Sequence, residues 1–322
     1  EYKLALHAIY IDHGLRPDEI PAEIEFCKKL CETLEVPFIT KSINVKSYAM
    51  DYGLNKQEAA RELRYKAFDE TSLEINANRI ALAHNADDQA ETFFMRILRG
   101  SGQRGLTGIP PVRGKIIRPL IEIERNEIEN FLLQNAERRT PSAEPPFIVD
   151  SSNLKKDYFR NWLRLAVMPE FKKQNPALVN TISRACEIIR EEDNYLELIV
   201  TKTLMKLIPK KTDKLIELFL VPLENMDKVI LRRVLRRAID AVKGLRGIGF
   251  IHIEDIITLV KKGDSGDRIY LPKGVRVIKG YATLILTSEQ PSQLRTYSLN
   301  VPEELALKES GILIKSSFAD SA

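Results

Sequence analysis

The sequence predicts an α/β fold that begins with a parallel-sheet domain and continues into a helical linker, a small α+β domain and the start of a β-rich segment. Three observations support this prediction. Strand-like apolar runs alternate with helical patterns over residues 1–100, a long amphipathic helix pattern follows, and hairpin-like runs come after it. A chain of 322 residues is also too long for one ordinary domain, so we expect several.

We place the first domain at 1–150. Its expected strands are 4–11, 37–43 and 79–83, and its expected helices are 22–35, 55–75 and 87–98. The apolar side chains of the last helix fit one helical face; they are Ala90, Phe93, Phe94, Ile97 and Leu98. Strands that alternate with helices form a parallel sheet covered on both faces, and ligands bind at the carboxyl ends of its strands.

Prolines and a change of periodicity end this first domain. The prolines are Pro141, Pro145 and Pro146. A helical linker at 151–210 follows, in which a short helix over 157–168 should stop at Pro169. A long amphipathic helix is expected over 178–207.

A separate small α+β domain is expected at 211–287, with a helical unit over 222–262. Its hairpin-like runs lie at 268–272, 275–279 and 281–287. The tail, 288–322, starts a strand-rich segment with YSLNV and ILIK and stops before it could close a core. Since the chain also opens without a Met inside an apolar run, we expect the natural protein to extend beyond both ends.

The composition is that of a soluble globular protein, with 44% hydrophobic and 29% charged residues. No apolar stretch approaches the about 18 residues that a membrane span requires, and no signal segment is visible, so no membrane partner is expected. The cysteines Cys27, Cys31 and Cys186 are too few and too scattered for a disulfide framework or a zinc site. We therefore expect a reducing, cytoplasmic location.

Charge is unevenly distributed along the chain. The net charge is +4, but residues 151–250 contain 20 Lys and Arg against 12 Asp and Glu. A positive segment favours a phosphate-rich partner through counterion release. Solvated helix faces explain the same excess, so charge alone leaves nucleic-acid binding open.

The most informative stretch runs from the strand at 79–83 into the next helix. The polar turn places His84 and Asn85 at the carboxyl end of the strand, with Asp88 and Glu91 on one face of the first helical turns. Two carboxylates in this arrangement suit Mg²⁺, which bridges substrate phosphates. An Asp at a helix start with a Glu three residues later also resembles a capping box, which needs no metal. The residues leave both interpretations open.

Three glycines follow this helix. Gly100, Gly102 and Gly105 match G-x-G-x-x-G, but that fingerprint needs a strand before it and a helix after it, so we reject a dinucleotide site. Two interpretations remain. One is a mobile, positively charged loop that carries Arg99 and Arg104 beside the carboxylates, and the other is a glycine turn that ends the helix.

Further arginines are candidates for phosphate binding. Arg61 shares a helical stripe with Glu58 and Tyr65, and a guanidinium near a strand end can bind phosphate bidentately, although surface pairing with Glu58 explains it as well. The candidates for RNA contact are Arg160 and Arg164, one turn apart, and the basic face of Arg232, Arg233, Arg236 and Arg237.

Five motif groups occur in a fixed order. They are IDHGLRP at 11–17, EAARELRY at 58–65, LAHNADDQAETFFMRILRGSG at 82–102, IIRPL at 116–120, and DSSN, RNWLR and MP between 150 and 169. Together they resemble the tRNA(Ile)-lysidine synthetase family, ATP-dependent tRNA-modifying ligases of the N-type ATP pyrophosphatase superfamily. Residues 271–286 are similar to the end of the family's small substrate-binding domain, and 297–314 to the start of its C-terminal domain.

The resemblance implies an adenine-nucleotide-hydrolase-like, Rossmann-like N-terminal domain and a reaction in two steps. ATP adenylates the C2 oxygen of the wobble cytidine in tRNA(Ile) with a CAU anticodon, and the amino group of free L-lysine then attacks C2 and expels AMP. By family position, Asp88 and Glu91 would hold Mg²⁺ and orient lysine, while His84 and Arg61 would act at the nucleotide. The other residues implied for the nucleotide are Asn85, Gly100 and Gly102, and those for tRNA are Arg99, Arg104, Arg160, Arg164, Arg232, Arg233, Arg236 and Arg237. A homodimer is left open.

One departure from the family pattern affects activity. The phosphate-binding motif SGGxDS, which precedes the segment matching IDHGLRP, does not occur in this sequence. Because loop amides at a helix N-terminus cradle pyrophosphate, the chain as given should bind ATP poorly and form no lysidine. Two alternatives are a tRNA thiolase of the same superfamily, which would need a reactive cysteine pair, and a tRNA-binding protein without catalysis.

Overall fold

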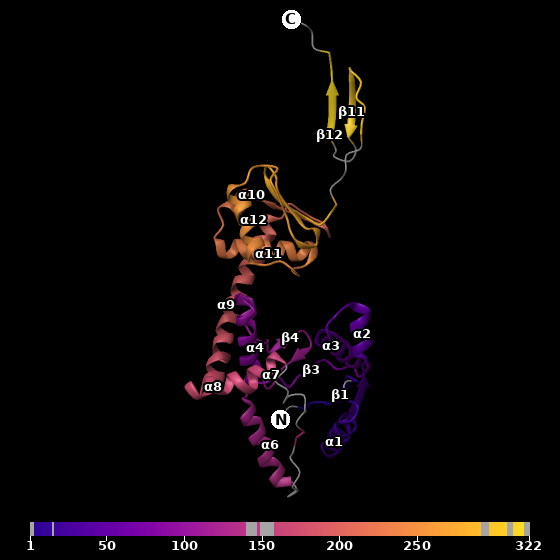
Figure 1. Cartoon of the computed structure of the whole chain (residues 1–322), viewed down its shortest axis with the longest axis vertical. Coiled ribbons are helices and arrows are strands. Elements are labelled where there is room, and N and C mark those ends of the chain that lie inside the picture. The colour runs from indigo at the N-terminus through magenta and orange to yellow at the C-terminus, as the bar shows by residue number, and fades with distance from the viewer. Residues whose placement is uncertain are drawn as a thin grey trace. The chain divides into compact units, whose positions relative to one another are not determined.

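The computed structural model describes residues 3–14, 16–139, 147–148, 158–290, 296–307 and 312–318. The chain forms two compact units, Glu1–Glu191 and Glu192–Ala322 (Figure 1). The finer division at 150, 210 and 287 stays a prediction, and the prolines and the DSSN motif expected at its first boundary lie outside the described residues. Among the described residues, no helix is both long enough and apolar enough to cross a membrane.

The first unit begins with a βαβ motif. Strands β1 (Ala8–Asp12) and β2 (Phe38–Ser42) pair in parallel, in register from Ala8 with Phe38 to Asp12 with Ser42, and α1 (Ile20–Thr33) connects them. The predicted strand 4–11 is wrong at its start, because Leu4 and Leu6 are 69% and 57% exposed and lie outside the paired segment.

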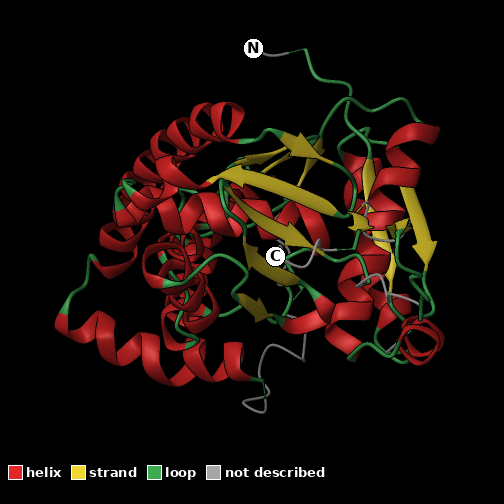
Figure 2. Cartoon of the chain, turned by 90° about the horizontal axis from the view of Figure 1, so that it is seen from above, coloured by secondary structure: helices red, strands yellow, loops and turns green. Residues whose placement is uncertain are grey.

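A second sheet in the same unit carries the stretch of greatest interest. It has the order β3–β5–β4, with β3 (Ile80–Ala81) parallel to β5 (Ile116–Ile117) and β4 (Val112–Arg113) antiparallel to β5. The parallel pairs in both sheets confirm the predicted fold class. The unit also contains the helices α2 (Val45–Tyr52), α3 (Lys56–Glu74), α4 (Ala86–Leu98), α5 (Gln103–Leu106) and α6 (Arg125–Arg139). Figure 2 draws all helices of the chain in red and all strands in yellow.

Helix α4 buries the predicted face over most of its length but not in its last turn. Ala90 is buried and Phe93 and Phe94 pack against the core, but Ile97 and Leu98 are exposed. The buried positions at the start of the helix are Ala86, Gln89, Ala90 and Glu91. Apolar spacing therefore predicts the buried face, but packing partners decide how far along the helix that face is covered.

The helical segment after residue 158 continues through Pro169. Helix α7 (Phe159–Trp162) leads into a π-helical turn, η2 (Leu163–Val167), and then into α8 (Met168–Gln174). The predicted stop at Pro169 is wrong: the chain passes from the π-helical turn into α8, and this proline lies in the first turn of α8, where proline is tolerated. The long helix α9 (Leu178–Leu207) has the predicted bounds.

The second unit contains a five-stranded antiparallel sheet in the order β6–β7–β10–β9–β8. The strands are β6 (Lys210–Lys211), β7 (Leu215–Phe219), β8 (Arg268–Tyr270), β9 (Arg276–Lys279) and β10 (Thr283–Thr287). The helices that pack on it are α10 (Leu220–Glu224), α11 (Lys228–Lys243) and α12 (Phe250–Lys262). The three predicted hairpin runs are confirmed as β8, β9 and β10.

The last described strands form a two-stranded hairpin of β11 (Glu303–Leu307) and β12 (Ile312–Ser316). The predicted strand ILIK lies in β12. The predicted strand YSLNV is wrong, because residues 297–301 do not form a strand and strand pairing begins at Glu303.

Candidate active site

The N-terminus of α4 follows directly on β3 and is closed by a capping box. The Asn85 side chain accepts a hydrogen bond from the Asp88 N–H at 2.9 Å, and the Asp88 carboxylate accepts one from the Asn85 N–H at 2.9 Å. A capping box is therefore present, but it lies three residues earlier than expected: Asn85 is the N-cap, Asp88 is its N3 partner, and Glu91 takes no part in it. It fixes the direction in which His84 and α4 leave the carboxyl end of β3.

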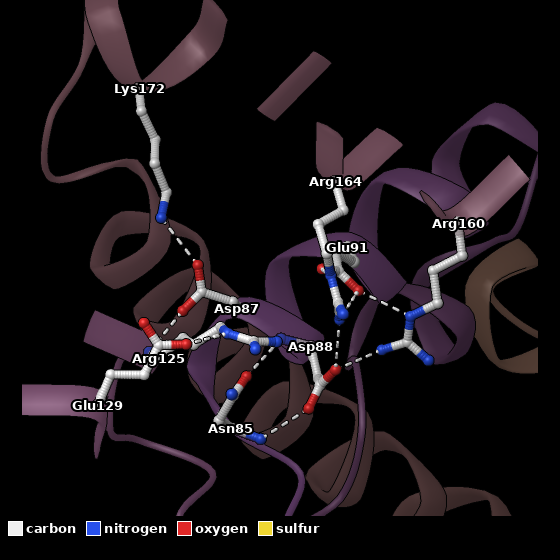
Figure 3. Close-up of polar contacts among 9 residues, drawn as sticks. All are labelled: Asn85, Asp87, Asp88, Glu91, Arg125, Glu129, Arg160, Arg164 and Lys172. Carbon is white, nitrogen blue, oxygen red and sulfur yellow. Dashed lines mark hydrogen bonds and ion pairs between the residues drawn. The ribbon is translucent and has the colours of Figure 1, made fainter. Parts of the chain in front are cut away.

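Asp88 and Glu91 also hold two arginines from the α7–η2 segment (Figure 3). Arg160 reaches Asp88 Oδ1 and Glu91 Oε2, both at 2.7 Å. Arg164 donates to Glu91 Oε1 at 2.6 Å and Oε2 at 3.0 Å, and to Asp88 Oδ1 at 3.2 Å. We call these four residues the carboxylate–guanidinium cluster. Its charges cancel, which stabilises the Glu91 carboxylate although its side chain is only 2% exposed.

The π-helical turn aligns the two arginines with α4. Leu163, which is fully buried, packs in the core that contains Ala86 and Ala90 of α4. Because Leu163 anchors the segment, Arg160 and Arg164 on either side of it point toward the same carboxylates. Burial by itself would lower the pKa of Arg164, but the hydrogen bonds and charges of Glu91 and Asp88 outweigh it and raise that pKa.

The cluster does not fit the predicted magnesium site. Every oxygen of the two carboxylates accepts an N–H hydrogen bond, from Arg160, Arg164 or the Asn85 backbone. Nor do the described residues contain any group of three His, Cys, Asp or Glu side chains arranged to hold a metal. Mg²⁺ needs free oxygen ligands, so we assign it no step.

Asp87, the acidic neighbour of Asp88, belongs to a different set of contacts. Its carboxylate accepts from Lys172 Nζ and from the Arg125 N–H, both at 2.8 Å (Figure 3). Two adjacent carboxylates on α4 therefore make two separate sets of hydrogen bonds, which makes Asp87 a matched control for the hydrogen bonds of Asp88, although its charge also acts on Arg164.

His84 lies beside this cluster and contacts a buried arginine. Arg118, which follows β5 and is 5% exposed, donates from Nε to His84 Nδ1 at 3.3 Å. Burial lowers the pKa of His84; the charge of Asp88 raises it, and those of Arg118, Arg160 and Arg61 lower it further. The role of Arg118 was not predicted, although the motif IIRPL contains it.

Arg61 lies on α3 at an open pocket of about 590 Å³ that Tyr65 and Arg113 also line. The guanidinium carbons of Arg61 and Arg113 each lie 5.1 Å from the centre of the Tyr65 ring. These cation–π contacts hold Arg61 close enough to lower the pKa of His84 by its charge. That Arg61 and His84 act at one nucleotide stays a prediction.

The glycine-rich segment after α4 ends that helix, and hydrogen bonds from Arg96 hold the residues that follow. Gly100 has φ +71°, a left-handed conformation that favours glycine at a helix end. Arg96 Nη1 donates to the carbonyls of Gly105 and Gly108, at 2.6 and 2.7 Å. Gly102 caps the short α5. The glycine-turn interpretation is therefore confirmed, while Arg99 and Arg104 project from the surface.

The arginines of α11 are mostly held by carboxylates of the second unit. Arg232 pairs with Glu254 at 2.7 Å, and Arg233 with Asp193 at 2.7 Å. Arg237 reaches Glu197 at 3.4 Å. The fourth, Arg236, is exposed. These pairings give the basic face a structural role, and its predicted contact with RNA stays a prediction.

The sequence of this chain is similar to those of known proteins. A family model for the PP-loop domain matches residues 1–171. The tRNA(Ile)-lysidine synthase of Caldanaerobacter subterraneus is 36% identical over 91% of this chain, and that of Clostridium acetobutylicum is 33% identical over 98%. The synthase of Geobacillus kaustophilus is 33% identical over 99% of this chain. The chain spans 61%, 67% and 68% of the length of these three relatives.

A solved structure also matches. The U34-tRNA thiolase NcsA from Methanococcus maripaludis, with its 4Fe-4S cluster, is 20% identical and has a TM-score of 0.44 over 58% of this chain and 62% of its own. At this similarity it carries no argument about this chain.

Proposed function

Because the chain belongs to the tRNA(Ile)-lysidine synthase family and carries its PP-loop domain, we propose that it is the catalytic part of an ATP-dependent ligase that forms lysidine in tRNA. Its substrates would be ATP, free L-lysine and tRNA(Ile) with a CAU anticodon. The observation that carries the proposal is the carboxylate–guanidinium cluster beside His84 at the carboxyl end of β3. Ligands of parallel sheets bind at such strand ends.

In the first step, the C2 oxygen of the cytidine attacks the α-phosphorus of ATP and pyrophosphate leaves. This reaction requires alignment and neutralised charge more than covalent help. Arg61 and Arg160, whose charges both reach His84, would supply positive charge next to the phosphates. The cytidine of an anticodon loop is already single-stranded, so moving it into a pocket costs little.

In the second step, the amino group of lysine attacks C2, loses a proton and expels AMP. Asp88 and Glu91 would bind the lysine ammonium, but in the structure they bind guanidinium groups. Lysine must then displace one arginine. Arg160 is the more exposed of the two, at 38% of its side chain against 25% for Arg164, so we propose that Arg160 leaves and turns toward the nucleotide.

The thiolase alternative is not favoured by any cysteine in the structure. Cys31 and Cys186 are buried, and burial raises the pKa of the Cys27 and Cys186 thiols, which makes them less reactive near neutral pH. None of the three contacts the carboxylate–guanidinium cluster within the described residues. The expectation that the 322-residue chain binds ATP weakly, for want of SGGxDS, stays a prediction.

The proposal is tested in the natural protein by Asp88→Asn. The amide oxygen of Asn can still accept from the Asn85 N–H and keep the cap, so the substitution removes mainly the charge. We expect lysidine formation to be abolished while tRNA binding is retained, because the cluster acts on lysine and the nucleotide. The measurement is incorporation of labelled lysine into tRNA(Ile) with a CAU anticodon, together with a filter-binding titration of that tRNA.

Asp87→Asn is the matched control, since Asp87 contacts Lys172 and the Arg125 backbone instead of the cluster. Incorporation by the Asp87 variant should stay near that of the wild type. Undiminished incorporation by the Asp88 variant would remove the assignment of the cluster, and tRNA binding without incorporation by the unsubstituted natural protein would favour a non-catalytic tRNA-binding protein.

A further inference from the structure

The contact between His84 and Arg118 determines which ring nitrogen of His84 can carry a proton. Arg118 Nε lies 3.3 Å from His84 Nδ1 and donates to it. An arginine side chain has only donors and is always protonated in proteins, so Nδ1 of His84 must accept. The proton of a neutral His84 is therefore on Nε2.

The hydrogen bonds and burial of Arg118 hold its side chain in one position. Its side chain is 5% exposed. Its Nη1 donates to the Pro110 carbonyl at 2.6 Å, and its backbone N–H donates to the Pro111 carbonyl at 2.9 Å. Side chain and backbone are thus both tied to the same turn, and the Nε–H remains directed at His84.

We infer that Arg118 is a positioning residue that locks His84 as the neutral Nε2–H tautomer, so that His84 serves the site as a hydrogen-bond donor and not as a proton acceptor at Nδ1. The donor role toward a nucleotide phosphate rests on the proposed function; the tautomer does not. An imidazole N–H can stabilise a phosphate oxygen as pyrophosphate or AMP departs, without accepting the proton that lysine releases.

The surrounding charges support a neutral ring. Arg118, Arg160 and Arg61 face His84 as cations, and Asp88 is the facing carboxylate. The charge of Asp88 is itself shared with Arg160 and Arg164 through the cluster. Burial and these cations together keep the pKa of His84 below its ordinary value of about 6.5.

The test is a nitrogen-15 spectrum of the histidine rings of the chain. Only four histidines are present, His7, His13, His84 and His252, so His84→Gln assigns the signals. We expect the long-range correlations of His84 to show the Nε2–H tautomer with an unprotonated Nδ1. This measurement requires no ATP, lysine or tRNA, so its failure is distinguishable from failure of the proposed function.

Arg118→Met should convert the His84 signal into a mixture of tautomers and raise its pKa, because an obligatory donor and a positive charge are both lost. Arg190→Met is the matched control. Arg190 donates to the Thr107 and Ile109 carbonyls of the same turn, at 2.9 and 3.4 Å, and is not among the groups that act on His84. A purely structural role of Arg118 predicts that both variants change His84 alike.

Three results decide the question. An Nε2–H tautomer in the wild type that is lost in Arg118→Met and kept in Arg190→Met supports the inference. An Nδ1–H tautomer in the wild type overturns it, and this result stands even if Arg118→Met does not fold. A His84 signal that Arg118→Met leaves unchanged, in a variant whose His13 signal shows the first unit to be intact, overturns it as well.

Discussion

Two regions of the molecule pair arginines with carboxylates, and they differ in burial. In the first unit, Glu91 is 2% exposed at its side chain and contacts two arginines. In the second, the Glu254 side chain is 25% exposed and pairs with Arg232 and Lys228 on the helix surface. Burial makes the charges around Glu91 interdependent, whereas solvent weakens the pairs that Glu254 makes with Arg232 and Lys228.

The comparison shows that an arginine-rich pattern does not by itself identify a nucleic-acid site. Arg232, Arg233 and Arg237 form the denser basic sequence, but carboxylates of their own unit hold them. Arg160 and Arg164 lie in a sparser sequence and converge with His84 at a strand end. Arg160 and Arg164 differ from the α11 arginines in their position in the fold, at the carboxyl end of a strand.

The largest difference between the two regions is expected for removal of the buried charge. Glu91→Gln leaves two guanidinium groups without their main partner and should lower the free energy of unfolding by about 3–5 kcal/mol. Glu254→Gln, the comparison, should lower the free energy of unfolding by clearly less, because solvent screens the pairs that it loses. Urea denaturation of both variants measures the difference.

Equal, small losses of stability in the two variants would contradict the distinction between a buried cluster and a surface pair. A larger loss of stability in Glu254→Gln than in Glu91→Gln would show that the surface pairs stabilise the fold more than the buried cluster does.

A smaller effect is expected in the titration of the surface pair. Hydrogen bonds from Arg232 and then Lys228 lower the pKa of Glu254 from 4.5 to about 2. A carboxyl whose pKa is depressed by folding stabilises the fold above its unfolded pKa, and this contribution is lost as pH falls through about 2. Arg232→Gln should return the pKa of Glu254 toward 4.5, which a carbon-13 titration of the carboxyl group follows.

A pKa of Glu254 that stays near 2 in Arg232→Gln would show that Lys228 or another group lowers it. Lys228→Gln is the companion variant and should give the smaller rise.

The elements that the sequence predicts well are those with strong, uninterrupted periodicity. Helix α9 has its predicted bounds, and the hairpin runs appear as β8, β9 and β10. Predictions from local sequence failed where tertiary contacts determine the end of a helix or the start of a strand. Pro169 lies in the first turn of α8, which directly follows a π-helical turn. Leu4 and Leu6 have no partner strand among the described residues.

The candidate site was predictable in its residues but not in its pairings. The strand–turn–helix pattern predicts His84, Asn85, Asp88 and Glu91 at one strand end, but it suggested a capping box of Asp88 with Glu91, whereas the observed box joins Asn85 and Asp88. The partners of Glu91, however, lie 69 and 73 residues away along the chain. No local spacing encodes such a contact, so a pair of carboxylates suited to Mg²⁺ and a pair that binds guanidinium look the same in sequence.

The central claim is that lysine exchanges with Arg160 at Asp88 and Glu91, and the most direct test is the kinetics of Arg160→Gln in the natural protein. Removing the competing guanidinium should lower the KM for lysine, by about three- to tenfold for a competition of about 0.7–1.4 kcal/mol. The same change should lower kcat by about a hundredfold, because one donor to the developing charge is lost. A KM for lysine that rises, or that stays constant while kcat is unchanged, would contradict the account.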